Sequence, residues 1–126
     1  MASSTISVDL HAETTRMDIH ETVRQLTSHL GPTLVALLAN VSDRKLPHKW
    51  STADGPEPRD ESKQRLMLAH RIWRELSQRE NDYTARNWFI GANPRLGEIS
   101  PAEALREGRL AEVKAAADAF LEGTDD

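Results

Sequence analysis

Four basic side chains fall within six residues in the first half of the chain: Arg44, Lys45, His48 and Lys49. Cations at this density can neutralise phosphates and release the counterions that surround DNA, and arginine in the major groove reads guanine. A similar density of basic residues also occurs on ordinary solvated helices. The cluster therefore indicates a candidate DNA-binding surface, with a plain solvated face as the alternative.

A second candidate site is a turn in the last third of the chain. Trp88 and Phe89 stand at the end of an expected helix, and a turn follows them that is built from Gly91, Asn93, Pro94 and Gly97. Apolar rings beside a rigid turn make a shaped surface that a partner could recognise. The alternative is that both rings are core anchors and that the turn only connects two helices.

Catalytic and metal chemistry find little support. The five histidines have no H-E-x-x-H or comparable ligand spacing, and the chain contains no cysteine, no nucleophile elbow and no glycine-rich phosphate loop. His70 is expected on the polar face of its helix. We expect no enzyme activity, no bound metal and no cofactor.

Length and composition favour a small intracellular protein. The chain has 126 residues, which fits one domain or one core with a smaller appendage. The absence of cysteine fits a reducing cytoplasm, and we find neither a membrane-spanning apolar run nor a signal pattern. The net charge of −4 is uneven, because residues 41–97 carry 11 basic against 8 acidic groups and residues 98–126 carry 3 against 8.

Apolar residues recur at helical spacing along most of the chain, and no run of alternating polarity demands a strand. The sequence therefore predicts an all-α fold of seven or so helices, which follow a disordered arm over residues 1–17. Start and stop signals, such as Asp18, Asn40 and Ser100, set the boundaries. The expected helices span residues 18–30, 32–39, 43–50, 60–78, 83–90, 101–107 and 109–122.

Two of these helices, over residues 32–39 and 43–50, have the outline of a helix-turn-helix with basic groups on its second helix. Pro47 leaves two alternatives for that helix. If it begins at Asp43, Pro47 removes its first internal hydrogen bond. If it begins near Leu46, Pro47 suits the first turn, but the helix is barely one turn long.

The run A-R-N-W-F-I-G-A-N-P-R-L-G-E-I-S-P-A-E-A-L-R-E-G, followed by a helix that ends F-L-E-G, resembles the C-terminal toxin-binding domain of Xre/MbcA/ParS-type antitoxins. The segment over residues 30–50 looks like the Xre-type helix-turn-helix of the same proteins. The resemblance at the C-terminus covers about residues 84–123. Its matching positions are Trp88, Asn93, Pro94, Leu96, Gly97, Pro101, Ala104, Leu105, Gly108, Val113 and Gly123.

This resemblance implies a cytoplasmic bacterial antitoxin of a type II toxin–antitoxin system. Residues 18–80 would form the helix-turn-helix region and residues 81–126 the toxin-binding domain. The implied partners are a RES-domain toxin that consumes NAD, whose active site the antitoxin covers, operator DNA, and a second copy of the chain in a homodimer. Carried over by position, the toxin contacts are Asn93, Arg95, Leu96, Phe120, Glu122, Asp125 and Asp126. The candidate DNA contacts are those of the basic cluster, Arg44, Lys45, His48 and Lys49.

Two other interpretations stay open. The chain could be a stand-alone helix-turn-helix transcriptional regulator whose C-terminal part serves dimerisation. It could also be a toxin-binding module that has lost DNA binding, and Pro47 is the residue that favours this alternative.

Overall fold

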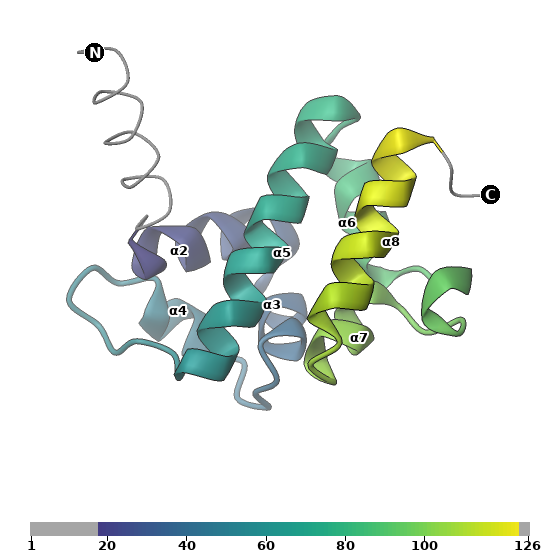
Figure 1. The fold of residues 1–126 in the computed structure, drawn as a ribbon. Coiled ribbons are helices and arrows are strands. Elements are labelled where there is room, and N and C mark those ends of the chain that lie inside the picture. The colour runs from purple at the N-terminus through teal and green to yellow at the C-terminus, as the bar shows by residue number, and fades with distance from the viewer. Residues whose placement is uncertain (1–17, 124–126) are drawn as a thin grey trace, which may run out of the picture.

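The computed structural model describes residues 18–123, which contain seven α-helices, one short 3-10 helix and no strand (Figure 1). The predicted all-α class is confirmed. The expected arm over residues 1–17, and the predicted contacts Asp125 and Asp126, lie outside the described residues. The elements are α2 (Ile19–Leu30), α3 (Pro32–Leu38), α4 (Leu46–Trp50), α5 (Asp60–Arg79), α6 (Asp82–Ile90), η1 (Pro94–Leu96), α7 (Pro101–Arg106) and α8 (Leu110–Glu122).

The first helix begins where the sequence predicts. Asp18 caps α2, because its Oδ1 accepts the backbone N–H of His20 at 3.0 Å. The carboxylate of Glu21 lies one turn on, where it accepts from Arg24 and, at 2.9 Å, from Gln25. These hydrogen bonds, with that of Arg24 the larger contribution, lower the pKa of Glu21 to about 2. The first turn of α2 is therefore stabilised both by the Asp18 cap and by the ion pair of Glu21.

Sharp backbone turns separate the next elements. Gly31 ends α2 at φ 87°, a conformation that glycine adopts without a steric penalty, and Pro32 opens α3. Asn40 follows α3 at φ 63°, as expected of a residue that tolerates the left-handed region. The turn at Gly31 folds α3 back on α2, and the turn at Asn40 ends α3, so the first corner of the fold follows from local sequence.

The third helix is shorter than the expected span of residues 43–50. α4 begins at Leu46 and has five residues, with Pro47 in its first turn, so the second of the two alternatives is correct. Pro47 and Trp50 are buried, and this packing holds α4 against the body of the protein. Arg44 and Lys45 consequently lie before the helix and not on it.

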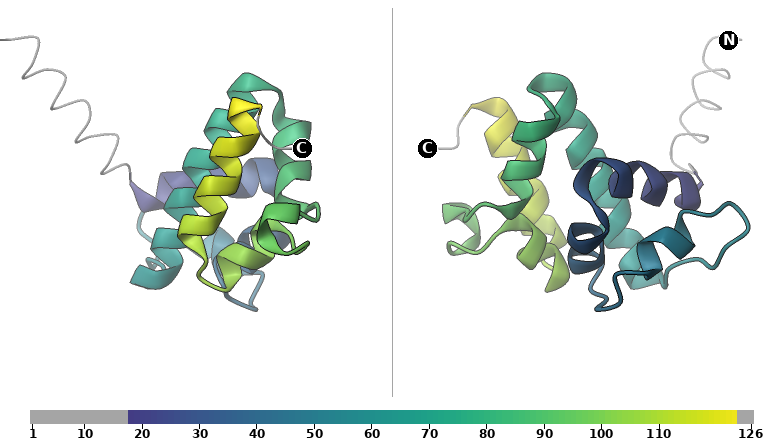
Figure 2. Two further views of the ribbon diagram at one scale, coloured as in Figure 1. Left: turned by 45° about the vertical axis from the view of Figure 1, so that its right-hand side comes forward. Right: turned by 180° about the vertical axis from the view of Figure 1, so that it is seen from behind.

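α5 is the central element, with α2 and α4 on one side and α6 and α8 on the other (Figures 1 and 2). Its apolar stripe is buried as predicted and includes Leu66, Ala69, Ile72, Trp73 and Leu76. The expectation that His70 lies on a polar face is wrong. Its side chain is buried, and its Nε2 donates to Oε1 of Gln25 on α2 at 2.7 Å.

The caps of the C-terminal helices also match the sequence. Asn81 caps α6 by accepting the backbone N–H of Thr84 at 2.8 Å, and Ser100 caps α7 by accepting that of Glu103 at 3.1 Å. Gly123 ends α8 at φ 74°. These local signals place α6, α7 and α8 within a residue or two of the predicted spans.

One continuous apolar core runs across the expected division between residues 80 and 81. Leu26, Leu38 and Leu66 from the first part belong to the same core as Leu105 and Val113 from the second. Two side chains of α5 add polar links to other helices, since Ser62 Oγ donates to the Ala39 carbonyl and Arg65 Nε to the Leu105 carbonyl, each at 2.7 Å. The C-terminal helices therefore complete the core that begins with α2.

Candidate functional site

The turn between α6 and α7 projects from the body of the protein beside α8 (Figures 1 and 2). Asn93 organises it. Its Oδ1 accepts the backbone N–H of Arg95 at 2.9 Å, and its carbonyl accepts those of Leu96 and Glu98, also at 2.9 Å. Its own N–H donates to the carbonyl of Ile99 at 3.0 Å. One residue thus closes both ends of the turn and gives it a fixed shape.

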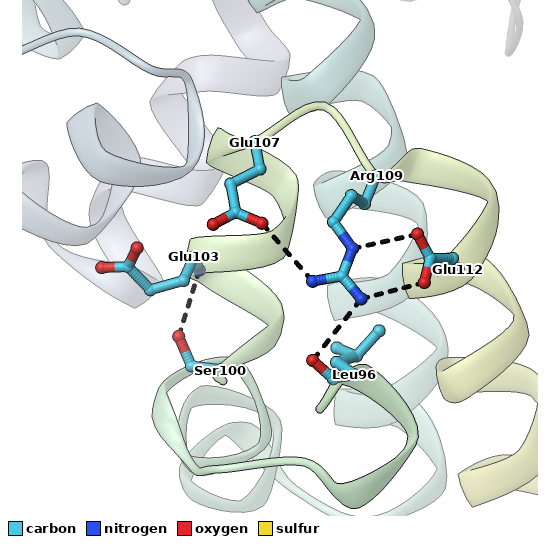
Figure 3. A network of polar contacts seen from close by, with 6 residues as sticks. All are labelled: Leu96, Ser100, Glu103, Glu107, Arg109 and Glu112. Carbon is cyan, nitrogen blue, oxygen red and sulfur yellow. Dashed lines mark hydrogen bonds and ion pairs between the residues drawn. The ribbon is translucent and has the colours of Figure 1, made fainter. Parts of the chain in front are cut away.

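Arg109 fastens this turn to the last two helices (Figure 3). Its guanidinium donates to both carboxylate oxygens of Glu112 at 2.9 Å, which is the paired geometry that suits arginine. It also reaches Glu107 at 3.4 Å and the carbonyl of Leu96 at 3.5 Å. The hydrogen bond from Arg109 lowers the pKa of Glu112, and those carboxylates raise the pKa of Arg109. The turn, the end of α7 and the start of α8 therefore meet at one side chain.

The aromatic residues at the end of α6 support the turn from within. Phe89 is fully buried, and the partly buried ring of Trp88 packs edge-on against it with centroids 5.3 Å apart. The indole N–H of Trp88 is buried without a hydrogen-bond partner in the described structure. Phe89 is therefore a core anchor, and Trp88 lies between the core and the surface.

The structure separates the predicted toxin contacts into inner and outer residues. Asn93 and Leu96 are only 5% and 1% exposed, so their side chains shape the turn from inside and cannot meet a partner in this conformation. Arg95 is exposed at the tip of the turn. Phe120 is half-buried and Glu122 exposed at the end of α8.

The end of α8 borders a small open hollow. It lies between the C-terminal ends of α5 and α8, and its lining residues are Arg79, Glu80, Phe120, Leu121, Glu122 and Gly123. Two of the predicted contacts thus form one wall of a depression that offers apolar surface between charged groups.

Sequence reasoning missed three residues around this site. Tyr83 and Ile90 on α6 are 77% and 46% exposed, which is high for large apolar side chains. Their separation of seven residues places them on one face of the helix, and this spacing was the available signal. Arg109 was also missed, although Glu112 follows it at a spacing that allows an ion pair on a helix.

The basic cluster lies at the other end of the molecule, around α4 (Figure 1). The side chains of Arg44, Lys45, His48 and Lys49 are all exposed, so the structure brings the four predicted DNA contacts to the surface. Three of them border a shallow open hollow whose lining residues are Pro32, Thr33, Ser42, Asp43, Arg44, Lys45 and His48.

Neither region contains a grouping of metal ligands, since residues 18–123 include no cluster of three or more histidine and carboxylate side chains that could hold an ion. Among the helices described, none is long and apolar enough to cross a membrane. Comparison with known protein families, with curated proteins and with solved structures finds no match.

Proposed function

We propose that this protein is the antitoxin of a type II toxin–antitoxin system and that it neutralises a RES-domain, NAD-consuming toxin by covering its active site. The motif from Trp88 to Gly108 is the basis of the proposal. The observation that supports it most is the construction of the turn. Hydrogen bonds to Asn93 and the ion pairs of Arg109 give a projecting segment one fixed shape. A preformed surface loses little entropy when it binds a partner.

The charge of the C-terminal part fits the same partner. Residues 98–126 carry 3 basic and 8 acidic groups. A cleft that binds the phosphates of NAD needs positive potential, and an acidic surface complements it. The contact surface that we propose combines Arg95 on the turn with Phe120 and Glu122 at the end of α8. Inhibition in this scheme is steric, and the antitoxin supplies no catalytic group.

Removal of residues 109–126 would be a poor test, because Val113, Ala116 and Ala117 of α8 are buried in the core and their loss would unfold the protein. Exposed substitutions are sharper. We expect the double variant Arg95→Glu/Glu122→Arg to stay folded and to lose at least about tenfold in affinity for the toxin encoded beside it. Arg71→Glu, on the exposed face of α5, is the matched control and should bind normally.

The measurement is NAD consumption by the purified toxin, titrated with each full-length antitoxin variant. Inhibition by the wild-type chain and by Arg71→Glu, with weaker inhibition by the double variant, supports the proposal. Failure of the wild-type chain to bind or inhibit the toxin would refute it.

The exposed basic cluster favours a second role at DNA, in which the same protein regulates its own promoter as a homodimer. In the first alternative, the protein is a stand-alone transcriptional regulator and DNA binding is its whole function. A toxin-binding module without DNA contact is the other alternative, and the five-residue α4 favours it. Binding to promoter DNA that weakens with rising salt and with Arg44→Ala/Lys45→Ala would exclude the latter.

A further inference from the structure

We infer that the basic cluster Arg44, Lys45, His48 and Lys49 binds the phosphate backbone of a DNA duplex and does not read base sequence. This inference rests on the DNA-binding part of the proposed function and is independent of the toxin-binding part. It also limits the DNA role, because a cluster that reads no bases cannot by itself distinguish the promoter from other duplexes. It follows from the length of α4, from the way its end is held, and from the groups that surround the cations.

α4 is too short to act as a recognition helix. Its five residues rise about 7.5 Å, which is little more than one turn. A helix that reads bases enters the major groove and presents several side chains to base edges. Only His48 and Lys49 of the cluster lie on α4, and Arg44 and Lys45 belong to the turn before it.

The body of the protein also fixes α4 in place. Pro47 and Trp50 are buried, and the carbonyl of Trp50 accepts a hydrogen bond of 2.7 Å from Nδ1 of the buried His20. The Ser51 hydroxyl donates to the carbonyl of Pro47 at 2.6 Å. The Ser51 hydrogen bond lies within the end of α4, whereas the buried side chains and the hydrogen bond from His20 prevent α4 from moving outward as a unit. The cluster therefore meets DNA as a surface patch and not as an inserted helix.

The groups around the cations suit phosphate oxygens. Thr33 and Ser42 line the same hollow as Arg44, Lys45 and His48, and their hydroxyls can donate hydrogen bonds beside the positive charges. Among the described residues that line this hollow, Asp43 supplies the one carboxylate, which accepts the backbone N–H of Lys45 at 2.9 Å. Arginine, lysine and hydroxyl side chains are the usual partners of DNA phosphates, and such contacts carry no sequence information.

The patch is also unsuited to single strands. Proteins that bind single-stranded nucleic acid stack the bases on aromatic rings. Trp50 is 4% exposed, and the residues that line the hollow include no tryptophan, tyrosine or phenylalanine. Exposed Tyr83 lies on α6, on the other side of the molecule from α4 (Figure 1). A duplex is therefore the expected ligand.

Fluorescence anisotropy of labelled duplexes tests this with the full-length protein. Two unrelated DNA duplexes of about 20 base pairs should bind with dissociation constants within about threefold of each other. If about three phosphates are neutralised, the logarithm of the association constant should fall with the logarithm of the salt concentration with a slope of about −2.7. Arg44→Gln/Lys45→Gln should reduce that slope by about 2, while Arg71→Gln/Arg74→Gln, on the exposed face of α5, should leave it unchanged.

Several results would overturn the inference. Selection from a randomised duplex pool should enrich no sequence, so a recovered site that binds about a hundredfold more tightly than random duplex would show base reading. Tighter binding to single-stranded DNA or to an RNA duplex would show that the ligand is misassigned. Base reading would leave the proposed DNA role standing, whereas failure to bind any duplex would remove that role as well. Toxin inhibition by Arg44→Gln/Lys45→Gln is measured separately and should be unaffected.

Discussion

Trp73 on α5 donates its indole N–H to Oδ1 of Asp82 on α6 at 2.8 Å. The other oxygen of that carboxylate accepts from Nδ1 of His29 on α2 at 2.6 Å. Burial alone would raise the pKa of Asp82, but the hydrogen bonds from His29 and Trp73 outweigh it and leave the pKa below its ordinary value. One carboxylate therefore ties three helices together across the expected division at residues 80 and 81.

Loss of this carboxylate should destabilise the whole chain. Asp82→Ala leaves the indole N–H of Trp73 without its partner, and we expect the free energy of unfolding to fall by about 1–2 kcal/mol. Urea denaturation followed by tryptophan fluorescence measures this. Asp118→Ala is the control, because among the described residues Asp118 pairs with the exposed Lys114 alone, one turn away on α8, and it should change stability by less than about 0.5 kcal/mol. Equal effects of the two substitutions would contradict the prediction.

A chain that ends at Glu80 should not fold cooperatively. It lacks Leu105 of α7 and Val113 of α8, which are fully buried in the core shared with α3 and α5. It also leaves Arg65 without the Leu105 carbonyl that accepts from its Nε. Circular dichroism during urea titration should show a broad, shallow change in place of one sharp transition. A sharp transition would instead show that residues 18–80 form an independent domain.

Local signals determined what the sequence could predict. Asp18, Asn81 and Ser100 each cap the helix that follows, and Asn40 takes the left-handed turn that its type allows. These positions depend on neighbours within a few residues, so helix boundaries and the all-α class followed directly.

Contacts between distant segments determined the rest. His70 looked like a surface residue, but its hydrogen bond with Gln25, on another helix, makes its burial possible. Asn93 and Leu96 belong to a motif that suggested partner contacts, yet folding turns both side chains inward. The role of Arg109 depends on the three-dimensional arrangement, because its side chain joins the turn, α7 and α8, which the sequence alone does not bring together (Figure 3).

In the loop after α4, Gly55 packs so closely against the backbone that there is no room for a side chain. A Cβ added to Gly55 would lie 2.3 Å from the carbonyl oxygen of Lys49, so Gly55→Ala must shift the backbone of the loop. We expect a loss of at least about 2 kcal/mol in the free energy of unfolding. Gly97→Ala is the matched comparison. Beyond its two chain neighbours, an added Cβ would meet no atom of the described residues within 4 Å, and only the φ of 74° is unfavourable, which costs about 1 kcal/mol. Equal losses in the two variants would show that the loop relaxes freely around the added methyl group, the outcome opposite to this prediction.

Stability should fall as the pH drops through the ordinary range of histidine. Burial, and to a lesser degree the nearby Arg74, lower the pKa of His70 in the folded protein below its ordinary value of 6.5. The unfolded chain therefore binds more protons than the folded one between those two pKa values, and folding loses free energy there. Full stability is present above about pH 6.5 and declines as the pH falls toward the folded pKa of His70.

Urea denaturation at a series of pH values should separate the loss of stability caused by His70 from a second loss at lower pH that comes from Glu21. The pKa of Glu21 is lowered from 4.5 to about 2 by its hydrogen bonds with Arg24 and Gln25, so its contribution is lost only between those values. We expect His70→Gln to flatten the decline between about pH 7 and pH 5, and Glu21→Gln to flatten only the decline below about pH 4.5. A His70→Gln variant that keeps the wild-type slope above about pH 5 would show that the buried imidazole is not its source.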